Sequence, residues 1–442
     1  MTRRPLLLIL IAALPLSACS LLKGNGPKTT PVIGDRTSIL GSKEAEVTID
    51  PSLADVAVLL PPAITNADWD QPGGSPTHSL GHLALPETLG LAWQARTEGI
   101  TKATRLAAAP VVVGGKLFAI DTDARVRAFD AATGAELWTM QLAPADGRNS
   151  RSLYGGGVSA SGDRVYATNG LGEVAALDSA TGAQIWRVKP GGPLRGSPTL
   201  AFGSLFVLSQ DNQLFSLRAT DGDLQWTQSG SVEGANVFGV AAPAAGQGTV
   251  VAGFSSGELG GYRYENGQPV WQDQLSRTRI TTSVGLLSDV DANPVIDQGR
   301  VYALGQGGRM VSLELVTGQR LWELNVAGIA TPWVAGEWLW AVTDGGVLFA
   351  VARSNGKIRW KTQLPRYRKP KSQSGPISWQ GPVLAGGRLI LVSSEGQMAE
   401  VDPATGAVTR SIEVGSSFHL PPVVANGTLY LLDDDGTISA RR

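Results

Sequence analysis

Short apolar runs separated by glycine, aspartate and asparagine turns dominate the chain from about residue 89 to its end. A representative stretch begins with Val111–Val113, continues after a Gly-Gly turn with Lys116–Ile120, and then has Val126–Phe129 before a final run that carries Trp138. Such short runs, alternating or continuously apolar, are typical of β-strands, whereas amphipathic helices need longer segments with a 3.6-residue period. The pattern therefore predicts four short antiparallel strands in this unit.

The four-strand unit recurs at a fixed spacing. Seven times, the position that opens a unit lies 28 residues before the position that closes it. Proline opens six of these units and tryptophan closes six of them. A constant period of this kind predicts a repeat architecture, and a four-stranded unit repeated around an axis is a β-propeller. The pairs are Pro110 and Trp138, Val158 and Trp186, Pro198 and Trp226, Pro243 and Trp271, Pro294 and Trp322, Pro332 and Trp360, and Pro382 and Arg410.

The two ends of the repeat predict how the ring closes. An eighth unit begins at Pro422, but its last strand would end at position 450, eight residues beyond Arg442. Upstream of the first unit, Leu89–Gln94 is an isolated strand that carries Trp93. We therefore predict an all-β, eight-bladed propeller of four-stranded antiparallel blades over residues 86–442, closed by the strand around Trp93. The alternative, an open solenoid, would leave both ends of the repeat unpaired.

Length variation is confined to one kind of connection. Because the 28-residue unit is constant, the variation falls on the segments between the closing position of one unit and the opening position of the next, which span 10 to 23 residues. All of these segments link the last strand of one blade to the first strand of the next, so they emerge on one face of the ring. Insertions on one face of a repeat protein commonly form its binding surface.

The N-terminus has the features of a bacterial lipoprotein signal. Two arginines precede an apolar run from Leu6 to Leu14, and the following Leu-Ser-Ala-Cys19 resembles a lipobox. We expect residues 1–18 to be a signal peptide, Cys19 to be lipidated, and residues 19–85 to form a lipidated, flexible tether. Ser20 after the cysteine favours the outer membrane, with the protein facing the periplasm. An ordinary signal peptide with an incidental cysteine is the alternative.

Composition excludes several classes of function. The 37 basic and 38 acidic side chains give a net charge near zero, so no overall field favours nucleic acid. One cysteine excludes a disulfide framework and any multi-cysteine metal centre. His78 and His82 have the spacing of helical metal ligands, but their glycine-rich surroundings favour loop histidines. No hydrolase, metalloprotease or phosphate-binding motif is present, so we expect no catalytic residue, no metal and no cofactor.

Two variable connections carry candidate partner-binding residues. The connection into the third unit carries Leu194 and Arg195, which both look exposed, and the connection into the fifth unit carries Asp289 and Asp291. These connections lie two units apart, a quarter turn of an eight-bladed ring, so one small partner domain could touch both through complementary charge. In the alternative interpretation, Arg195 pairs internally with Asp289 or Asp291, or the aspartates cap turns. The residues alone leave both interpretations open.

The lipobox, the tether and the eight PQQ-like repeats together resemble the BamB family of outer-membrane lipoproteins. The resemblance covers essentially the whole mature chain, and its most specific segments are Leu194–Ser197 and Leu287–Asp291. Gly192 is a departure, because we expect an apolar residue there. The resemblance implies binding to the periplasmic POTRA domains of BamA, within the β-barrel assembly machinery (BAM complex). The residues that it implies for this contact are Leu194, Arg195, Asp289 and Asp291.

The resemblance also implies a non-enzymatic scaffold that aids the assembly and insertion of outer-membrane β-barrel proteins, with unfolded barrel proteins as further candidate partners. One alternative is a PQQ-dependent dehydrogenase-like quinoprotein, which shares the eight-bladed fold. The single cysteine and the lack of a placed catalytic base argue against it. A second alternative is an envelope scaffold for another partner. The basic loop Arg366–Lys371 is either a solvated insertion or a partner contact.

Overall fold

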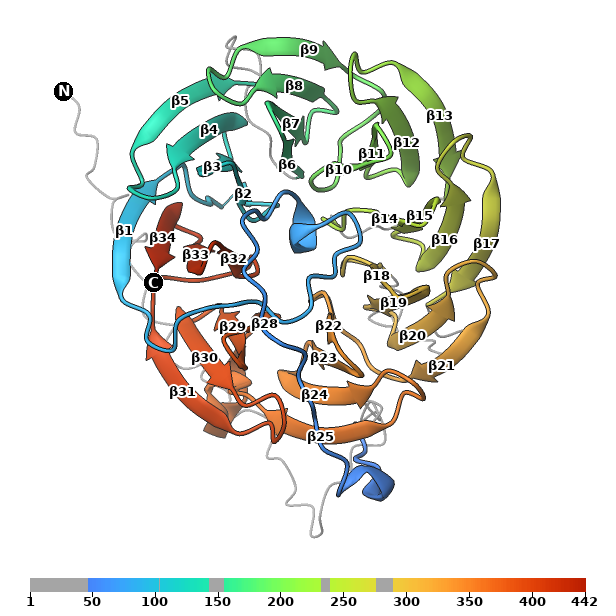
Figure 1. Ribbon diagram of the computed structural model, residues 1–442, viewed down its shortest axis with the longest axis vertical. Coiled ribbons are helices and arrows are strands. Elements are labelled where there is room, and N and C mark those ends of the chain that lie inside the picture. The colour runs from blue at the N-terminus through green and yellow to red at the C-terminus, as the bar shows by residue number, and fades with distance from the viewer. Residues whose placement is uncertain (1–46, 103, 143–154, 232–238, 276–288) are drawn as a thin grey trace, which may run out of the picture. The chain divides into compact units, whose positions relative to one another are not determined.

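The computed structural model of the protein describes residues 47–102, 104–142, 155–231, 239–275 and 289–442. Over these residues the chain forms eight four-stranded antiparallel sheets, arranged around a central axis as the blades of a propeller (Figure 1). The predicted all-β, eight-bladed fold is confirmed. No helix in the described ranges is long and apolar enough to cross a membrane.

The first four blades each run in chain order from an inner strand beside the axis to an outer strand (Figure 1). Blade 1 consists of β2 (Val111–Val113), β3 (Lys116–Ile120), β4 (Arg125–Asp130) and β5 (Glu136–Gln141). Blade 2 consists of β6 (Gly156–Ser161), β7 (Arg164–Asn169), β8 (Val174–Asp178) and β9 (Gln184–Val188). Blade 3 consists of β10 (Thr199–Ala201), β11 (Ser204–Leu208), β12 (Gln213–Arg218) and β13 (Leu224–Ser229). Blade 4 consists of β14 (Ala244–Gly246), β15 (Thr249–Gly253), β16 (Glu258–Arg263) and β17 (Pro269–Gln274).

The remaining blades follow the same order, apart from blade 8. Blade 5 consists of β18 (Val295–Asp297), β19 (Arg300–Gly305), β20 (Arg309–Glu314) and β21 (Arg320–Leu324). Blade 6 consists of β22 (Trp333–Ala335), β23 (Trp338–Val342), β24 (Val347–Ala352) and β25 (Ile358–Gln363). Blade 7 consists of β28 (Trp379–Ala385), β29 (Arg388–Ser393), β30 (Gln397–Val401) and β31 (Val408–Glu413). Blade 8 consists of β32 (Val423–Ala425), β33 (Thr428–Leu432), β34 (Thr437–Arg441) and β1 (Leu91–Arg96). Outside the blades lie a hairpin of β26 (Tyr367–Lys369) and β27 (Ser374–Pro376) and the 3-10 turns η1 (Pro51–Leu53), η2 (Pro72–Gly74) and η3 (Pro370–Ser372).

The tryptophan that closes each unit joins its blade to the next. Its indole N–H donates to a backbone carbonyl of the neighbouring blade, as from Trp138 to Ser179 O at 3.1 Å. The ring also lies against the glycine of the turn between the third and fourth strands of the neighbouring blade, which we call the Thr-Gly turn after its commonest sequence. A Cβ on Gly182 in this turn would come 2.5 Å from Trp138. The repeated tryptophan and glycine are therefore two halves of one contact between neighbouring blades. Trp93, Trp186, Trp226, Trp271, Trp322 and Trp360 make the same indole hydrogen bond.

Blade 8 takes its strands from both ends of the repeat. β1 pairs antiparallel with β34, and Trp93 lies opposite Ala440, so the predicted closure by the strand around Trp93 is confirmed. The third and fourth strands of this blade are not consecutive in the chain, so no Thr-Gly turn joins them. Blade 7, its neighbour, has Arg410 where six other units have tryptophan. The tryptophan is absent at the one position where there is no turn for it to contact.

Residues 64–85, predicted as part of a flexible tether, instead form a floor across the central opening (Figure 1). Within this floor segment the backbone or side chains bond to the inner strand of every blade or to the residue directly beside it. The clearest pairing joins Trp69 and Val112 through both N–H groups, at 2.7 and 2.8 Å. The inner strands leave backbone groups unpaired toward the axis, and buried groups of this kind need partners. The other contacts join Asp70 to Ala160, Gln71 to Leu200, Pro76 to Ala245, Thr77 to Ile296, Gly81 to Trp333, Leu83 to Leu384 and Asn66 to Asn426.

The preceding residues 47–56 cover the outer edge of blade 6. Ile49 forms a parallel bridge with Ile358 of β25, and Asp50 lies 3.0 Å from the Lys357 ammonium. Ile358 is 4% exposed, whereas Leu224, which holds the same position in blade 3, is 55% exposed. The tether prediction is therefore wrong for residues 47–85, which pack on the propeller. Residues 19–46 and Cys19 lie outside the described residues, so their roles stay predictions.

Candidate functional site

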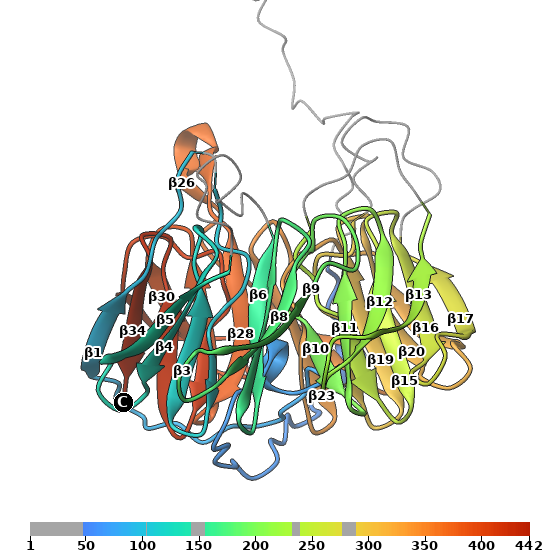
Figure 2. The same cartoon turned by 90° about the horizontal axis from the view of Figure 1, so that it is seen from above.

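The ring has two faces that carry different kinds of loop (Figure 2). On one, which we call the connection face, the outer strand of each blade leads to the inner strand of the next, and turns join the second and third strands. The floor segment and the Thr-Gly turns lie on the opposite face. All length variation between units falls on the connection face, and all four predicted partner-binding residues lie there.

The connection into blade 3 is held down along its backbone. Leu194 forms an antiparallel bridge with Ser209, and the Arg195 N–H donates to Leu208 O at 2.8 Å. The Leu194 side chain is fully buried in an apolar cluster with Trp186 and Phe215. The expectation that Leu194 is exposed is wrong, because this connection folds inward over the turn between β11 and β12 instead of standing out from the face.

The Arg195 side chain crosses the inner end of blade 4 and reaches the connection into blade 5. Its Nη2 lies 2.7 Å from Oδ1 of Asp289 and 3.2 Å from Oδ1 of Asp291. Its Nη1 lies 3.5 Å from the Gly253 carbonyl oxygen at the end of β15. Arg195 is 1% exposed. The structure thus contradicts exposure of Arg195 and confirms the alternative interpretation, in which these three residues pair internally.

The two aspartates occupy different environments. Asp289 is buried, and its carbonyl accepts the Gln306 N–H at 2.9 Å, which fixes the connection to blade 5. The Asp291 side chain remains 12% exposed. Burial raises the pKa of Asp289, although the Arg195 charge opposes this, and burial together with the Asp289 charge raises the pKa of Asp291 to about 6. Two carboxylates share one guanidinium, so the cluster has a surplus negative charge when both are ionised.

A third connection, into blade 4, completes this cluster, and the sequence analysis did not single it out. A Cβ on Gly239 would lie 1.5 Å from Nη2 of Arg195, so only glycine leaves room for the guanidinium. The next residue, Val240, donates its N–H to Asp291 and exposes 40% of its own surface. No repeat position marks these two residues. Their role depends on a side chain that arrives from another blade.

The two histidines of the predicted loop do not form a metal pair. The Nδ1 atoms of His78 and His82 lie 2.7 and 2.8 Å from the carbonyl oxygens of Pro294 and Pro61. Their loop setting is confirmed, since both belong to the floor segment. Within the described ranges, no group of three or more histidine, cysteine, aspartate or glutamate side chains is arranged to hold a metal ion.

The basic loop Arg366–Lys371 is part of the hairpin β26–β27, which rises from the connection face (Figure 2). Arg368 bonds to Glu395 at 2.6 Å, and Arg366 lies over the Tyr367 ring. Lys369 and Lys371 are exposed. The hairpin therefore presents positive charge on the same face as the Arg195 cluster.

Comparison with known proteins identifies the family. The family model described as outer membrane protein assembly factor BamB matches residues 122–362 and 367–441, which is well over half of the chain. The chain belongs to the BamB family. BamB of Salmonella typhimurium is 30% identical over 334 residues, covering 75% of this chain and 83% of that protein. BamB of Escherichia coli K12 is 28% identical over 391 residues, covering 88% of this chain and 97% of that protein.

Solved structures of similar fold include a BamB protein and enzymes. BamB from Moraxella catarrhalis superposes with a TM-score of 0.66 and 17% identity over 80% of this chain and all of that chain. Quinohemoprotein alcohol dehydrogenase from Comamonas testosteroni also gives a TM-score of 0.66, at 14% identity over 86% of this chain and 81% of that chain. At these identities both superpositions show the fold alone. The family model and the sequence relatives bear the name of an assembly factor and not of an enzyme, so the dehydrogenase alternative has only the shared propeller in its favour.

Proposed function

We propose that this chain is a non-enzymatic lipoprotein scaffold of the β-barrel assembly machinery that binds the POTRA domains of BamA through its connection face. Membership of the BamB family carries the proposal, because its relatives are named as outer-membrane assembly factors. In this role the protein would aid the assembly and insertion of outer-membrane barrel proteins. The cell outer membrane, on the periplasmic side, is its proposed location, with Cys19 as the lipid-bearing residue.

The burial of the predicted contact residues suggests how they would act. Leu194, Arg195 and Asp289 are too buried to form much of an interface themselves. They tie together the connections into blades 3, 4 and 5, so we assign them the role of positioning residues. Val240, which is exposed and whose N–H is held by Asp291, supplies an apolar contact at the centre of this region. Preorganised loops around an apolar anchor are typical of binding hot spots.

A calorimetric titration tests this assignment. Residues 20–442 are titrated into the soluble POTRA region of BamA from the same organism. Val240→Asp should weaken binding at least tenfold, or about 1.4 kcal/mol, because it puts a charge at the proposed apolar contact. The matched control is Val316→Asp, a residue that is 64% exposed in the Thr-Gly turn of blade 5 on the opposite face. Arg195→Ala and the pair Asp289→Ala and Asp291→Ala should also weaken binding.

Absence of binding by the parent protein at micromolar concentrations would contradict the function. Loss of binding with Val316→Asp but not with Val240→Asp would place the interface on the other face. The anchor has a separate test, in which Cys19→Ser should release the protein from the membrane fraction and remove the acyl chains seen by mass spectrometry. Unchanged fractionation of Cys19→Ser would contradict lipidation at this residue.

A further inference from the structure

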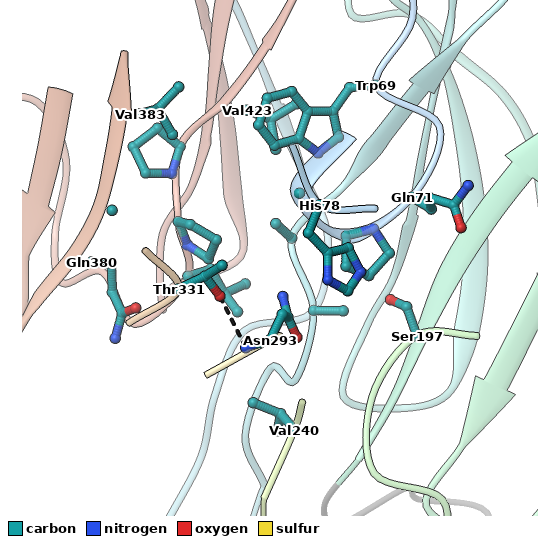
Figure 3. A pocket seen from close by; sticks show the side chains of 18 of the residues that line it. Trp69, Gln71, His78, Ser197, Val240, Asn293, Thr331, Gln380, Val383 and Val423 are labelled. Carbon is teal, nitrogen blue, oxygen red and sulfur yellow. Dashed lines mark hydrogen bonds between the residues drawn. The ribbon is translucent and has the colours of Figure 1, made fainter. Parts of the chain in front are cut away.

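A blind pit of about 110 Å³ lies on the propeller axis (Figure 3). Trp69, η2 and His78 of the floor segment close it on one side. Its wall includes the residues that open the repeat units, such as Pro110, Pro382 and Pro422, which stand where each connection meets its inner strand. The connection face is therefore its open side. An engineered apolar cavity of about 150 Å³ holds benzene, so this pit has room for one side chain.

His78 lines this pit and carries a buried, unsatisfied acceptor. Its Nδ1 lies 2.7 Å from the Pro294 carbonyl, which can only accept, so Nδ1 carries the proton. Burial lowers the pKa of His78 to about 4, which keeps the ring neutral and leaves Nε2 as a bare acceptor. His78 is 2% exposed, and no described residue hydrogen-bonds this Nε2 atom.

His82 shows that the open Nε2 is particular to His78. The two side chains lie four residues apart in the floor segment, and both place Nδ1 against a proline carbonyl. In His82, however, Nε2 accepts the Gly387 N–H at 2.9 Å, so both of its nitrogens are satisfied. Burying a polar atom without a partner costs free energy, so the Nε2 of His78 indicates a site for a donor that enters from the open side.

Other groups on the wall define the charge of that donor. Asp291, whose cluster has two carboxylates to one guanidinium, lines the pit. The buried Ser197 hydroxyl also lines it and has no hydrogen-bond partner among the described residues (Figure 3). Most of the remaining wall is proline, valine and alanine. A group with an apolar stem and a cationic, multiply donating end matches this lining, as lysine and arginine side chains do.

We infer that the central pit binds the ammonium or guanidinium end of a basic side chain, supplied by the protein that docks on the connection face. The identity of the protein that supplies this side chain rests on the proposed function, whereas the chemistry of the pit does not. The surplus carboxylate of the Arg195 cluster provides the charge, the His78 Nε2 and Ser197 hydroxyl accept hydrogen bonds, and the proline-lined wall covers the stem. A tyrosine or other neutral donor would leave the surplus charge uncompensated.

The test uses ¹⁵N-histidine-labelled residues 20–442 and follows the ring nitrogens by NMR. Titration with n-butylammonium should move the His78 Nε2 resonance saturably and leave that of His82 in place. Asp291→Asn should weaken this binding at least fivefold. The control Asp435→Asn removes a charge from an exposed turn on the same face, outside the pit lining, and should leave the affinity unchanged. The His82 resonances report whether each variant is folded.

Two further measurements distinguish the chemistry of the pit from the identity of the protein that supplies the side chain. Equal affinity for n-butanol and n-butylammonium, or a His78 resonance that neither probe moves, would overturn a cationic site. Addition of the POTRA region of BamA should reproduce the His78 shift. If that region binds without moving the His78 Nε2 resonance, the partner does not supply the side chain. If it does not bind at all, the proposed function fails, while the n-butylammonium titration still decides the chemistry of the pit.

Discussion

Replacing Asp291 with asparagine should change how the stability of the protein depends on pH. Asp291 lies beside Asp289 and Arg195, and its surroundings raise its pKa to about 6 from 3.8. The carboxyl group therefore favours the folded state when it is protonated. Its contribution is fully present below about pH 4 and is lost as the pH rises through about 6. An asparagine side chain at this position would keep an oxygen for Arg195 but would not titrate.

The size of the effect follows from the difference in pKa. A shift of about two units, at about 1.4 kcal/mol for each, corresponds to about 3 kcal/mol between the protonated and ionised extremes. The free energy of unfolding of Asp291→Asn, measured relative to the parent protein, should therefore increase by most of this amount, about 2 kcal/mol, between pH 4 and pH 7. Asp70, whose pKa burial also raises to about 6, is present in both proteins and cancels in the comparison.

Urea unfolding at pH 4, 5, 6 and 7, followed by tryptophan fluorescence, measures this difference. Asp178→Asn is the control, because bonds from Thr181 lower the pKa of Asp178 in its exposed turn. The stability that Asp178 contributes is present above its unfolded pKa of about 3.8 and is lost only as the pH falls below that value, so the stability difference between this variant and the parent should stay nearly constant from pH 4 to pH 7. A stability difference between Asp291→Asn and the parent that stays constant from pH 4 to pH 7 would refute the reasoning.

Three further changes test other parts of the structure. Gly239→Ala should lower the free energy of unfolding by about 3 kcal/mol in urea, since its Cβ would displace Arg195 from two carboxylates, whereas Gly192→Ala, whose Cβ meets nothing nearer than 3.8 Å, should change it little. Trp69→Ala removes a buried ring stacked on Trp333 and should cost about 3–5 kcal/mol in the same assay; a loss below about 1 kcal/mol would contradict a packed floor. Lys369→Glu with Lys371→Glu should slow association with the POTRA region several-fold at low salt in stopped-flow measurements, and an unchanged rate would remove the hairpin from the interface.

Much of the architecture is determined by the sequence itself. The 28-residue spacing between proline and tryptophan specifies the blades, because it holds the four strands of one unit, and the tryptophan that closes a unit contacts the glycine turn of the neighbouring blade. The isolated strand around Trp93 specifies the closure, because a ring needs a partner for β34. The same counting places Arg195 and Asp289 a quarter turn apart on one face. These are local or periodic properties, so the amino-acid sequence alone is enough to determine them.

Burial and pairing were decided only by the tertiary structure. Counting residues cannot tell whether Arg195 points outward or across blade 4, since that depends on the space left by Gly239 in a different connection. Residues 47–85 have no period of their own, and they fold only because eight inner strands and the edge of β25 offer unpaired backbone groups. The difference between His78 and His82 likewise arises from what faces each ring. Periodicity is a property of the sequence itself, whereas the environment of a side chain depends on contacts with segments that are far away in sequence.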